Sequence, residues 1–517
     1  MELIKRNIHM DRLKCEASTQ IVLEDDINIS DAREDASSLI MDKGNVVLEE
    51  VKVTDDHVKV KGYLEVCVLY TVDGKETDMA CMEGKIPFEE QIYTENVKST
   101  DQVEVNWEIE DLTVGLIHSR KLGVQAILTL KVSCEEICDE ETVVDLRGGE
   151  LLEFRKKPLQ VATLSMKKKD IFHLKQEVEI PGSFPNIMSL VFWDIVPTGT
   201  EVKLAGDKIN LQGELNAFFL YRGEGEEEEL CHYETVIPFS GNMECAGAKE
   251  SMIPEINCRT EVKGVDVRPD FDGEDRVFSF EVCVGLSISA YEEEETEILS
   301  DVYSVEKEAE LSEREATFRK FVSKGSGKMK LAQRLTLPEP ETIGKILHTA
   351  YHPVLTGQEL CEEGLVIQGY LQMKTLYLRD GERGGYGMLK KDLPFRYVLE
   401  CAYQENLRHY PVCGEVEQMA VTVLDGREID VKCILYFRAN LYTVRTEKIV
   451  EQIQLKDADA EKMASLPGMV IYMVREGESL WDIGKRYYVP VSELKKCNEL
   501  TSDEIKCGDR ILIVKNN

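Results

Sequence analysis

The residues that could bind phosphate or a metal lie in incomplete motifs. Segment 324–328 reads KGSGK. A phosphate-binding loop needs four residues between its glycines and a Ser or Thr after the lysine, but one residue separates these glycines and Met329 follows. We interpret the segment as a linker. His348 and His352 are four residues apart, but the glutamate that follows the first histidine of a zinc protease is absent, so packing is the stronger interpretation.

Other candidates for catalysis or metal binding are equally incomplete. Cys134 and Cys138 form a close pair with no second ligand pair nearby. The acidic runs 226–229 and 292–295 are interpreted as solvated loops without the spacing of a calcium-binding hand. No serine lies in a G-x-S-x-G context. We therefore predict no catalytic residue, no cofactor and no metal site, and a protein that is not an enzyme.

The C-terminal residues carry a dense motif. Residues 472–483 read YMVREGESLWDI, followed by L-x3-N-x-L and I-x2-G-x2-I-x-I up to residue 513. Ser479 suits a helix N-cap, and Leu480, Ile483 and Tyr487 are spaced as a buried helix stripe. Trp481 lies about 100° from Leu480 around that helix, with Tyr488 on the same flank. Trp481 is either part of a contact surface or the cover of a small core.

A second pattern, G-x-L-x4-L-Y-x3-G-x12-P-F, occurs three times, starting at Gly62, Gly213 and Gly369. The step of about 150 residues is that of a whole small domain. An acidic residue and Gly follow the Leu-Tyr pair and predict a tight hairpin turn. We expect the Pro-Phe pair to end the return strand and plug the core. The Tyr residues of the three copies should occupy equivalent positions.

Each copy also holds a longer alternating run. Apolar residues recur at every second position for ten residues after Arg120, Arg276 and Arg427, which predicts a half-buried strand. The middle copy has five extra residues near 268–273, interpreted as a longer loop. An apolar step at Leu39, Leu190 and Ile346 fits either a short helix or a strand.

These patterns predict a mainly β chain of three tandem antiparallel β-rich repeats, sandwich-like or barrel-like, followed by a small fourth domain. The predicted boundaries are 10–145, 165–302, 326–455 and 469–515. Connectors are expected near residues 146–170 and 303–330, the second one partly helical. The strand order and the oligomeric state stay open.

Composition restricts the classes of partner. The 517 residues include 97 acidic and 62 basic side chains, a net charge of −35, which argues against nucleic acid and anionic lipid as main partners. The basic cluster at 155–157 and 167–169 is interpreted as a solvated connector. The N-terminus lacks a secretory signal pattern and no run of 18 apolar residues occurs. Fifteen cysteines without framework spacing, with Cys67, Cys283 and Cys433 as core residues, favour reduced thiols in a cytoplasm.

The C-terminal motif resembles a LysM domain over residues 469–515, which implies a β-α-α-β fold. In LysM domains that bind N-acetylglucosamine polymers, the ligand lies between two loops, here 477–480 and 498–505. The usual Asp-Thr is replaced by Glu478 and Ser479, and the proline after the last strand is missing.

The whole chain resembles the SPOCS (DUF3794) and LysM domain-containing spore coat morphogenetic proteins of endospore-forming bacteria. The resemblance implies a non-enzymatic scaffold in the mother-cell cytoplasm, at the forespore surface, that binds the coat ATPase SpoIVA through its LysM domain, with other coat proteins as further partners. The alternative is a peptidoglycan-binding protein of the spore cortex or cell envelope. The residues expected to contact partner or glycan are Gly477, Glu478, Ser479, Trp481, Tyr488, Asn498, Leu500 and Ile505.

Overall fold

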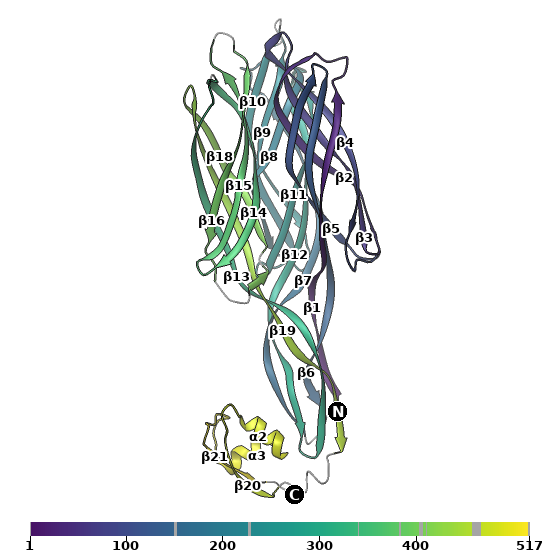
Figure 1. The fold of residues 1–517 in the computed structure, drawn as a ribbon, viewed down its shortest axis with the longest axis vertical. Helices are drawn as coiled ribbons and strands as arrows, with labels where there is room; N and C mark the ends of the chain where they lie inside the picture. The colour runs from purple at the N-terminus through teal and green to yellow at the C-terminus, as the bar shows by residue number, and fades with distance from the viewer. Residues whose placement is uncertain are drawn as a thin grey trace.

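The computed structural model shows an elongated β-rich body that narrows into a stalk, with a small helical domain beside the lower end (Figure 1). The chain is described over residues 2–148, 152–225, 229–339, 341–381, 384–402, 407–409, 411–457 and 467–514. The mainly antiparallel β class predicted from the sequence is confirmed.

Each repeat is built from two sheets with the same strand order. In repeat 1, β2 (Ala36–Thr54), β3 (His57–Val72) and β4 (Lys75–Tyr93) form one sheet in that order, and β1 (Glu2–Asn28), β6 (Lys121–Arg147) and β5 (Val103–His118) form the other. In repeat 2 the corresponding sheets are β8 (Ile187–Ala205), β9 (Lys208–Gly223) and β10 (Leu230–Glu244), and β7 (Leu152–Glu179), β12 (Asp275–Ser304) and β11 (Ile253–Pro269). In repeat 3 they are β14 (Ile343–Cys361), β15 (Gly364–Arg379) and β16 (Tyr386–Leu399), and β13 (Lys307–Thr336), β19 (Glu428–Asp457) and β18 (Val412–Asp425), with β17 (Leu407–His409) also on β19.

The two sheets of each repeat enclose one core. The alternating residues after Arg120, Arg276 and Arg427 point into it as predicted, because successive side chains of a strand face opposite sides. The three arginines also recur in one role, since each donates to a backbone carbonyl before the second strand of its repeat. Their acceptors include the carbonyls of Arg33, Pro181 and Leu337.

The recurring Gly and Phe of the sequence pattern form a cross-strand pair. Gly213 lies opposite Phe239, and a Cβ atom on the glycine would come within 2.8 Å of the phenylalanine ring. Gly369 and Phe395 repeat this arrangement, with the same 2.8 Å distance. The glycine therefore makes room for an aromatic ring that fills the core. The preceding proline does not end the strand as predicted: Pro87 pairs with Tyr63 within β4, which lies at a sheet edge, where a missing N–H is tolerated.

The recurring Tyr residues occupy equivalent positions, as predicted. Tyr70, Tyr221 and Tyr377 are buried, and each hydroxyl donates to an acceptor 36 residues earlier in the chain. Leu39, Leu190 and Ile346, for which helix and strand were both open, lie on strands β2, β8 and β14. The five extra residues of the middle copy enlarge the turn between β11 and β12.

Several segments expected to be loops are strands. Most of 146–170 and 303–330 belongs to β7 and β13, including segment 324–328, which pairs with β19. Residues 292–295 lie on β12, paired with β7. The acidic residues 226–228 fall outside the described residues. The sequence prediction was wrong at these places because charged residues alternate with half-buried ones on long edge strands that project from the body.

The three repeats meet at several shared clusters. Ile40, Phe192 and Leu347, from β2, β8 and β14, share one apolar cluster. A second apolar cluster contains Ile8, Val161 and Phe318, from β1, β7 and β13. A third cluster lies in the lower stalk. Each cluster draws on all three repeats, so the body is one packed unit.

A buried charge network also joins the repeats. Asp194 of β8 accepts from Lys43 of β2 at 2.5 Å and lies 2.9 Å from Nε2 of His348 on β14. Burial alone would raise the pKa of Asp194, but the Lys43 ammonium and the hydrogen bond with His348 hold it well below its usual range. His348 thus packs in the interface, which agrees with the interpretation from the sequence.

Candidate functional site: the LysM domain and its contact with the stalk

The C-terminal domain folds as β20 (Met469–Met473), α2 (Leu480–Tyr487), α3 (Val491–Cys497) and β21 (Arg510–Val514). Ser479 is the N-cap of α2: it accepts from the backbone of Asp482, whose carboxylate in turn accepts from the Ser479 backbone. This capping box satisfies helix N–H groups that would otherwise lack partners. Leu480 and Ile483 are buried in the core and Tyr487 packs at its edge, so the predicted stripe is confirmed.

The first predicted contact loop has its polar groups engaged within the domain. Glu478 accepts from the Tyr472 hydroxyl at 2.8 Å, from the Arg475 backbone, and from Arg486 at 2.7 Å. These hydrogen bonds lower the pKa of Glu478 to about 2, with the Tyr472 hydroxyl as the largest cause. Gly477 is exposed at φ 78°, a conformation that favours glycine.

The second predicted loop is likewise held by internal contacts. The Asn498 side chain donates to the carbonyls of Leu494 and Leu512 and accepts from the Leu512 backbone at 2.6 Å. It therefore ties α3 to β21. Leu500 and Ile505 pack half-buried against the domain core. Most of the predicted contact residues thus also maintain the fold.

Trp481 is not on an exposed flank, because the stalk of repeat 2 covers it. Its exposed fraction is 8%, and its Nε1 donates to Asp301 of β12 at 2.7 Å. Lys485, one helical turn later, donates to the other oxygen of Asp301 at 2.6 Å. The guanidinium of Arg155 on β7 lies 5.6 Å from the indole centroid, within cation–π range.

Tyr303 of β12 completes the contact. Its ring packs edge-on against Trp481 at 4.9 Å, and its hydroxyl donates to the carbonyl of Val489 at 2.8 Å. A Cβ atom on Gly484 would lie 2.7 Å from that hydroxyl, so the close approach depends on glycine. Tyr488 is also buried, but it is the left-handed C-cap of α2 rather than part of a helix flank, contrary to the prediction.

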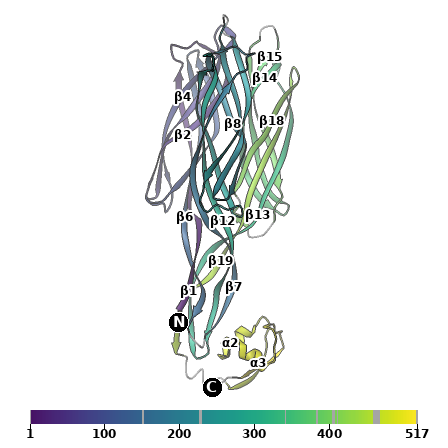
Figure 2. The same ribbon diagram turned by 180° about the vertical axis from the view of Figure 1, so that it is seen from behind.

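We call Arg155, Asp301 and Tyr303 the stalk dock. Sequence reasoning missed these residues, although a comparison of the repeats contains a signal. In the strand register their positions correspond to Ile4, Asp145 and Arg147 in repeat 1 and to Ser312, Gln452 and Gln454 in repeat 3. Only repeat 2 combines an arginine, a carboxylate and an aromatic ring at its tip. Both views place the LysM domain beside the lower end of the stalk (Figure 2).

The outer face of the LysM sheet carries exposed apolar side chains. Met469, Ile471 and Met473 alternate along β20 and are 66%, 70% and 58% exposed. Val470 and Tyr472, between them, pack toward the core. We call the three exposed side chains the β20 row. Adjacent large apolar side chains on so small a domain are typical of a protein contact surface.

The comparisons with known proteins agree with this architecture. The family model described as SipL, SPOCS domain matches residues 35–117 and 186–268, which fall in repeats 1 and 2, and the LysM domain model matches residues 472–514. Neither the search of curated proteins nor that of solved structures found a match. In the described part of the chain, no helix has the length and apolar character to cross a membrane. The chain therefore carries two copies of the SPOCS domain together with a C-terminal LysM domain.

Proposed function

We propose that this protein is a non-enzymatic morphogenetic scaffold of the spore coat, whose LysM domain binds a SpoIVA-like coat ATPase at the forespore surface in the mother cell. The SPOCS and LysM domains indicate a sporulation-related protein, and both are binding domains rather than catalytic ones. The packed body of three repeats supports the scaffold role, because it holds the LysM domain at one end of a long packed support.

The β20 row is the observation that carries the choice of a protein partner. Three large apolar side chains in a line favour burial against another protein. The polar groups of Glu478 and Asn498, in the loops predicted to bind glycan, are held by internal hydrogen bonds. We place the partner contact on the β20 row.

Replacing one member of the row tests the proposal. Ile471→Ser in the full chain should weaken co-precipitation of the SpoIVA-like ATPase about thirtyfold, the effect of losing an anchor of about 2 kcal/mol. Ile137→Ser is the matched control, because Ile137 is a similarly exposed isoleucine on the stalk. Equal binding by wild type and Ile471→Ser would remove the β20 row from the interface.

The LysM match also supports a second candidate, binding of peptidoglycan. Retention of the full chain on purified peptidoglycan, without binding of the ATPase, would favour it over the scaffold. A glycan site in the loops would lose affinity on Gly477→Val and keep it on Ile471→Ser. The opposite pattern is expected for the protein partner.

Trp481 requires a separate test, because it contacts the stalk dock in this structure. If the partner uses Trp481, release of the domain by Tyr303→Ala should strengthen binding. If the partner uses the β20 row alone, the same variant should bind as wild type does. Adding Trp481→Ala to the Tyr303→Ala variant should weaken binding if the partner contacts Trp481. It should leave binding unchanged if the partner contacts the β20 row alone.

A further inference from the structure

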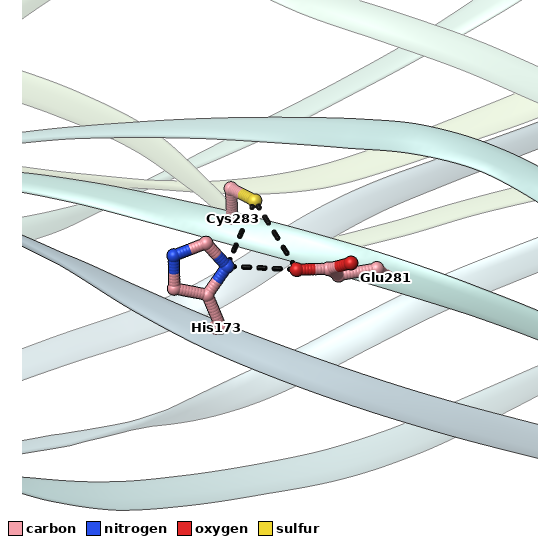
Figure 3. Close-up of side chains that lie close together, drawn as sticks. All are labelled: His173, Glu281 and Cys283. Carbon is pink, nitrogen blue, oxygen red and sulfur yellow. Dashed lines mark hydrogen bonds and ion pairs between the residues drawn. The ribbon is translucent and has the colours of Figure 1, made fainter.

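Three side chains of repeat 2 with different metal-binding atoms converge on one face of a sheet. His173 of β7 lies opposite Cys283 of β12 in the strand register, and Glu281 is two residues away on the same face (Figure 3). His173 Nδ1 lies 2.7 Å from Glu281 Oε1 and 3.5 Å from Cys283 Sγ, and the sulfur lies 3.9 Å from Oε1. In the described residues these three ligand atoms form one group within 4.8 Å.

We propose that His173, Glu281 and Cys283 bind a zinc ion. A thiolate, an imidazole and a carboxylate form a donor set that suits Zn²⁺, with a water or another oxygen in the fourth position. Glu261 of β11 lies opposite Cys283 in the register and is a candidate fourth ligand.

The distances come close to those of a tetrahedral site. Zn–S of about 2.3 Å and Zn–N or Zn–O of about 2.0–2.1 Å place sulfur about 3.6 Å from the other two donor atoms, and those two about 3.4 Å from each other. The observed separations from Cys283 are 3.5 and 3.9 Å. The pair His173–Glu281 must open by about 0.7 Å from 2.7 Å, a change that exposed side chains can make.

The repeated architecture shows that the fold does not require these residues. The corresponding positions hold Val22, Gln125 and Ile127 in repeat 1, and Lys330, Lys432 and Ile434 in repeat 3. Neither set can ligate zinc in this manner. Repeat 2 thus has three metal-binding side chains where the other repeats have aliphatic, amide or basic ones, without any change of strand order.

Lys263 on β11 is the neighbour that opposes a bound cation. Burial raises the pKa of the Cys283 thiol, and the Lys263 ammonium acts in the opposite direction. Zinc binding must form a sulfur–zinc bond while the thiol proton passes to the solvent, with His173 neutral. The lysine therefore eases deprotonation of the thiol but repels the bound ion, and these two effects on zinc affinity oppose each other.

The test uses the reduced, chelator-treated full chain with Cys497→Ser and Cys507→Ser, because those cysteines are exposed and would bind zinc themselves. Calorimetric titration with Zn²⁺ should give one site per chain and release of a proton. Co²⁺ in its place should produce a thiolate charge-transfer absorption band. Zinc should also raise the melting temperature, since it binds the folded state.

His173→Ala, Glu281→Gln and Cys283→Ser should each weaken zinc binding tenfold or more, on the order seen when a metal site loses a supporting group. His9→Ala is the matched control, because His9 forms the same kind of pair with Asp139, at 2.8 Å. Unchanged affinity in His173→Ala and Glu281→Gln, or a cobalt band that survives Cys283→Ser, would overturn the proposal.

Discussion

Repeat 2 differs from repeats 1 and 3 at three places, although all three share one strand order. The stalk end of repeat 2 carries the stalk dock, and its β7–β12 sheet carries the His173–Glu281–Cys283 group. On its other sheet, β8 supplies Asp194 to the charge network between the repeats. The glycine–phenylalanine pair and the arginine at the start of the last strand recur in every copy. The shared residues build the fold, and the differences give one repeat its individual contacts.

The largest expected effect concerns the sheet face on which repeat 2 meets the other two repeats. Equivalent positions there hold Lys43 in repeat 1, Asp194 in repeat 2 and Ala350 in repeat 3. Asp194→Ala leaves Lys43 and His348 without their buried partner, and should cost about 3–5 kcal/mol of unfolding free energy. Denaturant unfolding of the full chain measures the loss. Asp139→Ala, which removes an exposed ion pair, should cost at most about 1 kcal/mol. Equal losses would mean that the network does not hold the repeats together.

A smaller effect is expected at the tip. Tyr303→Ala removes the ring against Trp481 and the hydrogen bond to Val489, and should weaken the LysM–stalk contact by about 2 kcal/mol or more. Hydrogen exchange of the amides of α2 should become faster, and the Trp481 fluorescence should shift to the red. Gln454→Ala, at the corresponding position of repeat 3, should change neither. A response to Gln454→Ala would show that the contact is not specific to repeat 2.

The smallest effect is a pH dependence within the LysM domain. The pKa of Glu478 is lowered to about 2, so its contribution to stability is fully present above its ordinary value of about 4.3 and is lost as the pH falls through 2. In Glu478→Gln, the loss of stability that wild type shows on protonation of this carboxylate at low pH should be absent. Protection factors of the α2 amides between about pH 5 and pH 2 measure it. Glu476→Gln, an exposed neighbour, is the control, and an identical acid response in Glu478→Gln and wild type would contradict the assignment.

Much of the fold followed from the sequence, because its signals are local. Period-two alternation after each recurring arginine, the turn at Gly74 and the spacing of Leu480, Ile483 and Tyr487 depend on neighbouring residues alone. The equivalent placement of Tyr70, Tyr221 and Tyr377 followed from the repeat. The long strands β7 and β13 did not, since charged residues on narrow projecting strands produce no clear hydrophobic period.

The candidate sites depend on contacts between distant parts of the chain. The sequence placed Trp481 off the helix core and left its role open, and only the tertiary structure brings Asp301 and Tyr303, about 180 residues away, against it. Likewise, Cys283 lies in an apolar run and was predicted as a core residue. It is buried, but on the face opposite Val282 and Val284, where the pairing of β7 with β12 sets His173 beside it. A local pattern determines which face of a strand or helix a residue occupies. The partner on that face is decided by packing, because it comes from a segment with no fixed spacing in the sequence.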